Sequence, residues 1–243
     1  MDDGGVRHVK NAVIVVPYRG SSAWREAGET RRRNWEYARA WWSELGLPIF
    51  IGDSPANARF DVTKARNAAL ALATQMNPDW DVALMTDADA VLGSLNQAKA
   101  ALGVAFATRG YVAAHSELRY LSPRGAAYAE RGYAITEAAV EMTIAETWET
   151  VFAFPRDLWE EIGGFDPRFS GFGHQVEAFF HAATTLRGND RITGPCYHFW
   201  HPYSADSPHP ALKANRALVE RYWEAADNEA AMRELVSEYV VAV

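Results

Sequence analysis

Short apolar runs alternate with longer amphipathic segments through the first 95 residues of the chain. Residues 12–16 (AVIVV), 48–52 (PIFIG) and 82–86 (VALMT) predict three strands, the first of them buried on both faces. Between the strands, residues 24–45 and 63–76 carry apolar side chains at helical spacing and predict two helices. Strand, helix, strand, helix, strand is the order typical of a mostly parallel, doubly wound α/β sheet.

The pattern after residue 95 is less regular. Helices are predicted over residues 96–107, 155–162 and 175–186 and from about residue 210, with strand signals at 150–154 and 192–200 and a mixture of strand and loop signals over 110–133. No stretch has the composition of a linker, so we expect a single domain over residues 1–243. Its parts would be a nucleotide-binding half (about 12–95), an acceptor half (about 96–204) and C-terminal helices packed on it (about 205–243).

Polar side chains follow all three predicted strands of the first half. Pro17, Tyr18 and Arg19 come after the first strand, Asp53 after the second, and Asp87-Ala88-Asp89 after the third. Ligands of doubly wound sheets bind beyond the carboxyl ends of the strands. The coincidence therefore predicts a ligand site at this edge of the sheet.

Asp87 and Asp89 lie two residues apart in the sequence MTDADA. Their carboxylates could bind Mg²⁺ or Mn²⁺, ions that prefer oxygen ligands and keep open positions for phosphate oxygens. In that hypothesis Asp89 binds the metal, and Asp87 is shared between the metal and a ribose or a bound water. The alternative is a polar turn with a helix cap, since aspartate pairs are common in turns.

Lys64, Arg66 and Asn67 open the second predicted helix in DVTKARNAAL. Cations at the start of a helix oppose the helix macrodipole, so their presence there favours a nearby anion such as a diphosphate. Arg66 is the stronger candidate and Lys64 the second. The alternative is a solvated first turn capped by Asp61 or Thr63.

Two histidines, His198 and His201, bracket Phe199-Trp200 in the sequence PCYHFWHP. A neutral imidazole can complete a metal shell built on aspartate, whereas a lone histidine among aromatic side chains is usually structural. Cys196 is better explained as a small buried residue than as a ligand.

Composition restricts the class of protein. Apolar residues make up 49% of the chain and charged residues 23%, which is ordinary for a soluble globular protein. The single cysteine excludes an internal disulfide and a zinc site with several cysteines, and the net charge of −7 gives no general attraction to nucleic acid. No apolar run reaches the ~18 residues of a membrane span, and no apolar signal region follows the N-terminus. We therefore expect a cytoplasmic protein that does not interact with a membrane.

Together these motifs resemble the nucleotide-sugar glycosyltransferases of the GT-A fold, in particular the galactosyltransferase and polypeptide N-acetylgalactosaminyltransferase-like families. The similarity spans roughly residues 12–225 and rests on VIVVPYRG, KARNAAL, MTDADA, GGFDPRFSGFGHQVE and YHFWH. It implies an α/β fold, a UDP-linked sugar donor and a Mn²⁺ or Mg²⁺ cofactor. It also implies nucleoside contacts from Pro17, Tyr18, Arg19 and Asp53, further donor contacts from Lys64, Arg66, Asn67 and Asp87, and metal ligands among Asp87, Asp89 and His198, with His201 in reserve.

The chain departs from the family pattern in one segment. The family commonly carries a Glu-Asp pair after an aromatic-glycine turn, where it binds the acceptor and can act as general base; here His174 and Gln175 occupy that place. Gln175 cannot take a proton, so the candidate bases are His174, Glu177 and Glu149. A retaining mechanism, in which the departing phosphate deprotonates the acceptor, would need none of them.

Two other functions fit part of the pattern. A nucleotidyltransferase also uses carboxylates and a metal, although its first strand is typically followed by a glycine-rich basic loop and PYRGSSAWR has one glycine. A nucleotide-sugar or glycan-binding module without turnover would explain the missing acidic pair. For an enzyme, the acceptor could be a glycan, a protein, a small molecule or a modified nucleic-acid base.

Overall fold

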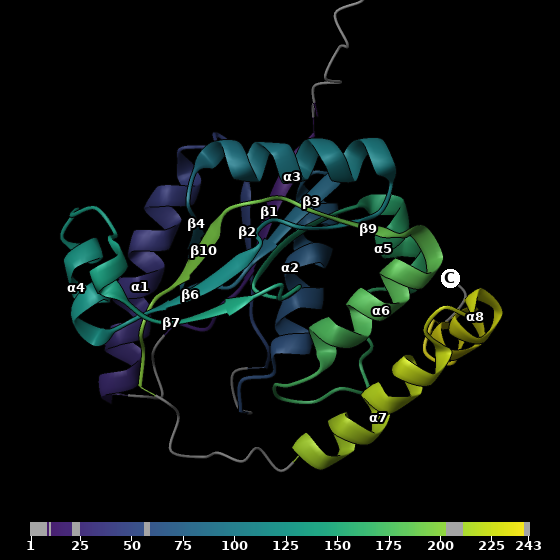
Figure 1. Ribbon diagram of the computed structural model, residues 1–243. Helices are drawn as coiled ribbons and strands as arrows, with labels where there is room; N and C mark the ends of the chain where they lie inside the picture. The colour runs from purple at the N-terminus through teal and green to yellow at the C-terminus, as the bar shows by residue number, and fades with distance from the viewer. Residues whose placement is uncertain (1–8, 10, 21–24, 56–58, 203–210, 241–243) are drawn as a thin grey trace, which may run out of the picture.

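A six-stranded sheet in the order β2-β1-β3-β8-β5-β9 forms the centre of the computed structural model (Figure 1). The structure describes residues 9, 11–20, 25–55, 59–202 and 211–240. The strands of this sheet are β1 (Ala12–Pro17), β2 (Ile49–Gly52), β3 (Val82–Thr86), β5 (Tyr111–Ala113), β8 (Val151–Pro155) and β9 (Asn189–Arg191). Pairing is parallel for β2-β1, β1-β3 and β5-β9 and antiparallel on both sides of β8, so β8 runs against the other five strands. The prediction of a mostly parallel central sheet is confirmed.

Helices cover both faces of the sheet, because alternate residues of each strand point to opposite sides. Val13 and Val15 of β1 pack in one core cluster with α2 (Val62–Met76), α5 (Arg156–Ile162) and α6 (Gln175–Arg187). Ala12, Ile14 and Val16 pack in the other with α1 (Arg25–Ser43) and α3 (Leu95–Thr108). The continuous apolar run of β1 therefore supplies both cores, as a strand buried on both faces must.

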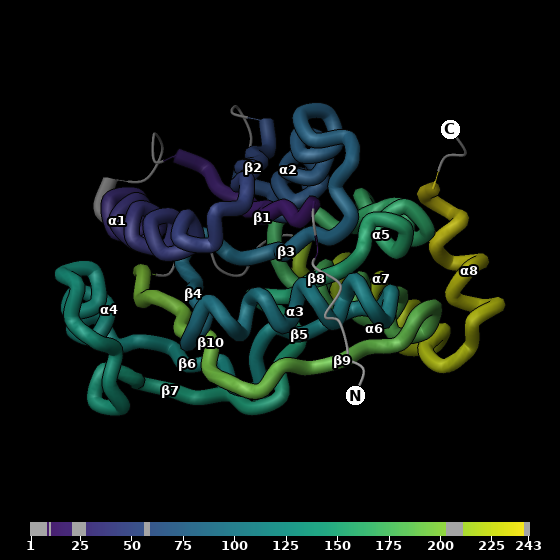
Figure 2. Tube along the Cα trace, turned by 90° about the horizontal axis from the view of Figure 1, so that it is seen from above, coloured from purple at the N-terminus to yellow at the C-terminus, as the bar shows by residue number. Residues whose placement is uncertain are grey.

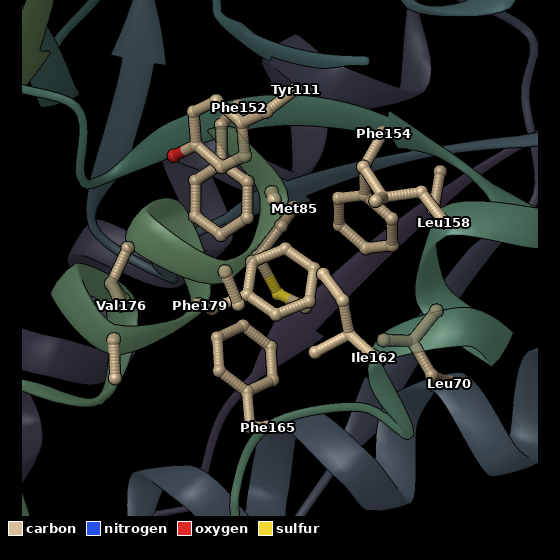
Figure 3. Packing of buried hydrophobic residues seen from close by; sticks show 14 of the residues in the cluster. Leu70, Met85, Tyr111, Phe152, Phe154, Leu158, Ile162, Phe165, Val176 and Phe179 are labelled. Carbon is tan, nitrogen blue, oxygen red and sulfur yellow. The ribbon is translucent and has the colours of Figure 1, made fainter. Parts of the chain in front are cut away.

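Aromatic rings fill much of the first core (Figure 3). Tyr111 of β5 stacks on Phe152 of β8 with ring centroids 5.0 Å apart, and Phe179 of α6 lies 4.8 Å from Phe165 in the loop after α5. Two C-terminal helices, α7 (Leu212–Ala225) and α8 (Glu229–Ser237), lie alongside α6 (Figure 1) and contribute Tyr222, Met232, Leu235 and Val236 to the same cluster. The predicted boundary between residues 204 and 205 lies outside the described residues.

A second sheet was not predicted from the sequence. Its four strands, in the order β4-β10-β6-β7, lie beside α4 (Figure 2). The elements are β4 (Ala90–Leu92), β6 (Glu117–Leu121), α4 (Pro123–Glu130), the 3₁₀ helix η1 (Glu137–Ala139), β7 (Val140–Ala145) and β10 (Pro195–His198). β4 and β10 have only three and four residues and show little periodicity, and β10 pairs with strands that lie far earlier in the chain.

Local signals explain several helix ends. Asp61 caps α2, since its carboxylate accepts a hydrogen bond from the Lys64 amide at 3.1 Å. Gly163 ends α5 in the left-handed conformation, at φ 75°. None of the helices in the described part of the chain combines the length and apolar character that a membrane crossing requires.

Candidate metal and donor site

The carboxyl ends of β1, β2 and β3 lie side by side, and those of β1 and β3 open into a cavity of about 240 Å³. Because these strands are parallel and in register, Pro17 lies beside Gly52 and the residues that follow each strand meet at one edge. Those that line the cavity include Pro17, Tyr18, Arg19, Arg31, Phe60, Asp87, Asp89, His198 and His201. The edge at which the sequence predicts a ligand site therefore carries a cavity.

Asp89, His198 and His201 converge on one side of this cavity. Asp89 immediately precedes β4, and β4 pairs antiparallel with β10, so that Ala90 lies opposite His198. The Nε2 atoms of His198 and His201 lie 3.4 and 3.3 Å from the two carboxylate oxygens of Asp89. One potential ligand atom from each residue lies within 4.8 Å of the others. The pairing of two short strands thus joins ligands that are more than a hundred positions apart in the sequence.

Neighbouring elements fix the backbone on both sides of this group. The Phe199 amide donates a hydrogen bond to the Asp89 carbonyl at 2.8 Å. From α1, the side-chain amide of Asn34 donates to the Trp200 carbonyl and the indole of Trp42 donates to the Ala90 carbonyl, each at 3.0 Å. Both segments that carry ligands are therefore held by the same helix.

The potential ligand atoms of Asp89, His198 and His201 suit a divalent metal ion. Burial alone would raise the pKa of Asp89, but the charges of His198, His201 and Arg31 outweigh burial and lower it. Burial lowers the pKa of His201. The shift of His201 favours the neutral imidazole, which is the form that binds metal, and a bound metal ion would replace the histidine charges beside the ionised Asp89 carboxylate. One carboxylate with two imidazoles leaves coordination positions for phosphate oxygens and suits Mn²⁺ better than Mg²⁺, which prefers oxygen ligands.

Arg31 is a cavity residue that was missed from the sequence. It lies on α1, and its Nη2 atom is 3.4 Å from Nδ1 of His201. A guanidinium beside metal ligands opposes metal binding unless an anion joins them, and a phosphate would satisfy both. Arg31 begins a run of three arginines, so its sequence context did not distinguish it from solvated neighbours.

Arg66 lies behind Asp87 and is not among the residues that line the cavity. Its Nη2 donates to Oδ1 of Asp87 at 2.9 Å, and its guanidinium carbon lies 5.3 Å from the centre of the Phe165 ring. Arg66 is 4% exposed, and its Nε and Nη1 atoms have no hydrogen-bond partner among the described residues. The structure thus brings Arg66 to Asp87.

Lys64 and Asn67 also lie away from the cavity lining. The Lys64 side chain is 57% exposed, with its ammonium 3.8 Å from Asp61. The Asn67 side chain exchanges two hydrogen bonds with the Phe165 backbone, at 2.8 and 3.1 Å, and so holds the loop after α5.

Arg19 and Asp53, the residues expected at the nucleoside, form an ion pair at 2.9 Å. Arg19 also donates to the carbonyl and hydroxyl oxygens of Ser54, at 2.6 and 2.8 Å. Tyr18 packs against Trp35 with ring centroids 5.4 Å apart. Arg19 and Tyr18 line the cavity, whereas Asp53 lies behind Arg19 and is not among its lining residues.

The three candidate bases lie in two places. His174 and Glu177 stand at the start of α6, where Nδ1 of His174 is 2.9 Å from Oε2 of Glu177 and the indole of Trp223 donates to Oε1 of Glu177 at 2.9 Å. Glu149 precedes β8, next to the end of β3, because the Asp87 amide donates to the Thr150 carbonyl at 3.1 Å. Solvent reaches the Glu149 side chain, but the protein around it excludes enough water to raise its pKa.

No known family model matches the sequence, nor does any curated protein sequence. Solved structures are similar in fold. S. aureus TarS 1–349 in complex with UDP-GlcNAc gives a TM-score of 0.51 at 12% identity, over 95% of this chain and 71% of that one. GalNAc-T7 with UDP, GalNAc and Mn²⁺ gives 0.50 at 11% identity, over 90% of this chain and 49% of that one.

The catalytic domain of Drosophila β1,4-galactosyltransferase 7, in complex with xylobiose, gives a TM-score of 0.47 at 14% identity over 76% of this chain. The matched region covers 64% of that domain and about half of GalNAc-T7. At these identities the comparison concerns the fold alone. The described chain has the fold of the GT-A nucleotide-sugar glycosyltransferases.

Proposed function

We propose that this protein is a metal-dependent glycosyltransferase that transfers a sugar from a UDP-linked donor, with Mn²⁺ as the metal. The observation that carries the proposal is the convergence of Asp89, His198 and His201 beside the cavity at the carboxyl edge of the sheet. Ligand sites of such sheets lie at this edge. TarS and GalNAc-T7, which share the fold, were solved with UDP-GlcNAc and with UDP and Mn²⁺, and this supports the choice of donor and metal.

The residues of the site have separate roles in this proposal. Asp89, His198 and His201 would hold the metal, which supplies positive charge to the diphosphate as it leaves the sugar. Arg31, which lies beside His201, would contact a phosphate oxygen. Asp87, held by Arg66, accepts a hydrogen bond from the ribose or from a bound water. Pro17, Tyr18 and Arg19 line the nucleoside end of the cavity.

The test combines binding with turnover. Calorimetry with UDP in the presence of Mn²⁺ should show binding that chelation of the metal weakens. Hydrolysis of UDP-Glc, UDP-Gal, UDP-GlcNAc and UDP-GalNAc should then identify the donor. Asp89→Ala should abolish both the metal dependence and the hydrolysis. Asp79→Ala is the matched control, because Asp79 is an exposed aspartate that precedes β3 at the opposite edge of the sheet. Full activity of Asp89→Ala would sink the metal assignment.

A second candidate function is binding of a nucleotide sugar without turnover. It is favoured by His174 and Gln175, which stand where the resemblance places an acidic pair. The two functions differ in one measurement: a binding module would bind UDP and Mn²⁺ with the same dependence on Asp89 but would consume none of the four donors.

A further inference from the structure

Residues 146–150, here called the Glu149 loop, connect β7 to β8. The loop meets the cavity residue Asp87, whose amide donates to the Thr150 carbonyl, although no residue of the loop lines the cavity itself. Arg191 of β9 holds the first half of this loop. Its Nη2 donates to the Glu146 carbonyl at 3.0 Å, and its Nη1 donates to the Thr147 carbonyl at 2.6 Å. The same guanidinium lies 3.9 Å above the centre of the Trp148 ring, which stacks on Phe180 from α6. One arginine therefore fixes both the backbone and the aromatic side chain of the loop.

Two further side chains hold the second half of the loop. The Tyr111 hydroxyl donates a hydrogen bond to the Trp148 carbonyl, and the Tyr111 ring is locked in the aromatic core by stacking on Phe152 (Figure 3). His115 is fully buried, and its Nε2 lies 2.8 Å from the Glu149 carbonyl. Since a carbonyl can only accept, Nε2 must carry the proton. Side-chain donors thus bind four consecutive carbonyls, from Glu146 to Glu149.

The loop has an unfavourable backbone that this set of contacts maintains. Glu146 and Thr150 have φ angles of 59° and 74°, in the left-handed region that favours glycine. Non-glycine residues persist in that conformation when the surrounding structure over-determines them, as it commonly does at functional sites. Glu149 lies between these two residues, so the fixed backbone holds its Cα in one position.

Of the three candidate bases, Glu149 is the one whose side chain is not engaged elsewhere in the described part of the chain. Both oxygens of Glu177 accept or face a partner, Trp223 on one side and His174 on the other. The same contact occupies Nδ1 of His174 and leaves its Nε2 as the only ring nitrogen that could accept a proton. The Glu149 carboxylate has no hydrogen-bond or ion-pair partner among the described residues, and solvent reaches it.

We propose that Glu149 is the general base of the transfer reaction and that Tyr111, His115 and Arg191 are its positioning residues. This inference rests on the proposed glycosyltransferase function. An acceptor oxygen forms a bond to the anomeric carbon while the bond from that carbon to the diphosphate oxygen breaks and its electron pair stays on the diphosphate. The acceptor proton passes to the Glu149 carboxylate. A single displacement of this kind inverts the anomeric configuration.

The surroundings of Glu149 suit a base. Desolvation raises its pKa, and the nearby charges of Asp87 and Glu177 raise it further, while Arg66 and His174 act in the opposite direction. A carboxylate with a raised pKa holds a proton better near neutral pH than an ordinary exposed glutamate does.

A nucleophile without a proton tests the base directly. Water and azide can both replace the unidentified acceptor, but azide has no proton to lose. Glu149→Gln should lower hydrolysis of the UDP-sugar about 100-fold or more, and should leave formation of the glycosyl azide within a factor of about two of wild type, because that reaction needs no base. Glu141→Gln, which removes an exposed carboxylate from β7, should change neither reaction.

The outcomes separate the inference from the proposed function. Unchanged hydrolysis in Glu149→Gln, an equal loss in both reactions, or a product with retained configuration would overturn Glu149 as base while leaving the glycosyltransferase intact. A wild-type protein that consumes no UDP-sugar would overturn the proposed function and the inference with it.

The positioning residues are tested by kinetics rather than by stability. Tyr111→Phe keeps the packed ring and removes the donor to the Trp148 carbonyl, so kcat for hydrolysis should fall roughly 10-fold with little change in donor KM. His115→Gln can still donate to the Glu149 carbonyl and should retain more activity than His115→Leu. In the Glu149→Gln background, Tyr111→Phe should cause no further loss, because the two changes remove one function. Additive losses, or a change confined to KM, would show that the positioning residues have only a structural role.

Discussion

Replacement of Arg66 by methionine tests how the structure uses a buried cation. Removing one partner of a well-satisfied buried ion pair typically costs about 3–5 kcal/mol. Arg66 is not well satisfied: it is 4% exposed, it makes one hydrogen bond to Asp87, and two of its nitrogens have no partner among the described residues. The usual cost should therefore not apply.

The expected change in stability follows from the individual contacts. The lost charged hydrogen bond is worth about 1.5–3 kcal/mol, and the lost contact with the Phe165 ring about 0.5–2 kcal/mol. Against this, each unpaired buried N–H group that disappears relieves about 1–3 kcal/mol. Methionine fills the same space as the stem of the arginine, and the side chain of Asp87 is 28% exposed and can be hydrated. The free energy of unfolding should thus change by less than about 2 kcal/mol.

Activity should respond much more strongly than stability. Without Arg66 the Asp87 carboxylate has no anchor, and misplacement of a group at a reacting site by about 1 Å can cost roughly 100-fold. Urea denaturation gives the stability, and hydrolysis of the UDP-sugar with Mn²⁺ gives the activity. Lys64→Met is the matched control on the same helix; its exposed side chain should affect neither measurement. A loss of more than about 4 kcal/mol would show that the Nε and Nη1 groups are satisfied in solution. Unchanged turnover would refute the role of Arg66 in positioning Asp87.

Three further predictions follow from single contacts. Arg31→Met should tighten Mn²⁺ binding in the absence of nucleotide, because it removes a cation beside His201, but should weaken UDP binding about 10-fold; calorimetry that shows both affinities moving in the same direction would contradict this. Glu149→Gln should stabilise the fold at pH 7 and not at pH 4. The folded-state pKa of Glu149 lies above its ordinary value of 4.5, so the wild type loses stability as pH rises through the folded pKa. Equal denaturation midpoints of variant and wild type at pH 7 would refute this prediction. Gly52→Ala should destabilise the fold by more than about 3 kcal/mol, because a Cβ at this position overlaps the Ala65 carbonyl and the backbone of Ala69 on α2. A melting temperature within a few degrees of wild type would contradict this prediction.

The central sheet and the place of the site could be predicted from the sequence because their signals are local. A run such as AVIVV can be satisfied only in a strand covered on both faces, and parallel strands bring their carboxyl ends to one edge. That reasoning led to Asp87, Asp89 and Tyr18 at the cavity. The assignment of individual roles to these residues stays a prediction.

The helix macrodipole was a poorer guide to the placement of Lys64 and Arg66. Their position at the start of α2 suggested an anion-binding pair, but Asp61 caps this helix, Lys64 points to solvent and Arg66 turns inward to Asp87. Residues three and four apart share a helix face, whereas two residues only two apart do not. Which of the two faces the interior depends on the strands and loops that α2 packs against.

The sequence by itself determined the order of strands and helices as far as β3, the edge at which polar residues gather and the residue types able to bind a metal. Only the tertiary structure decided that His201 joins His198 on Asp89, that Arg31 faces the same cavity, and that Glu149 is held beside Asp87. The physical reason is sequence distance. Hydrophobic periodicity reports on the burial of neighbours within one element. The two histidines meet Asp89 through the pairing of β10 with β4, Glu149 meets Asp87 through the pairing of β8 with β3, and Arg31 meets His201 from α1; no local pattern records these contacts.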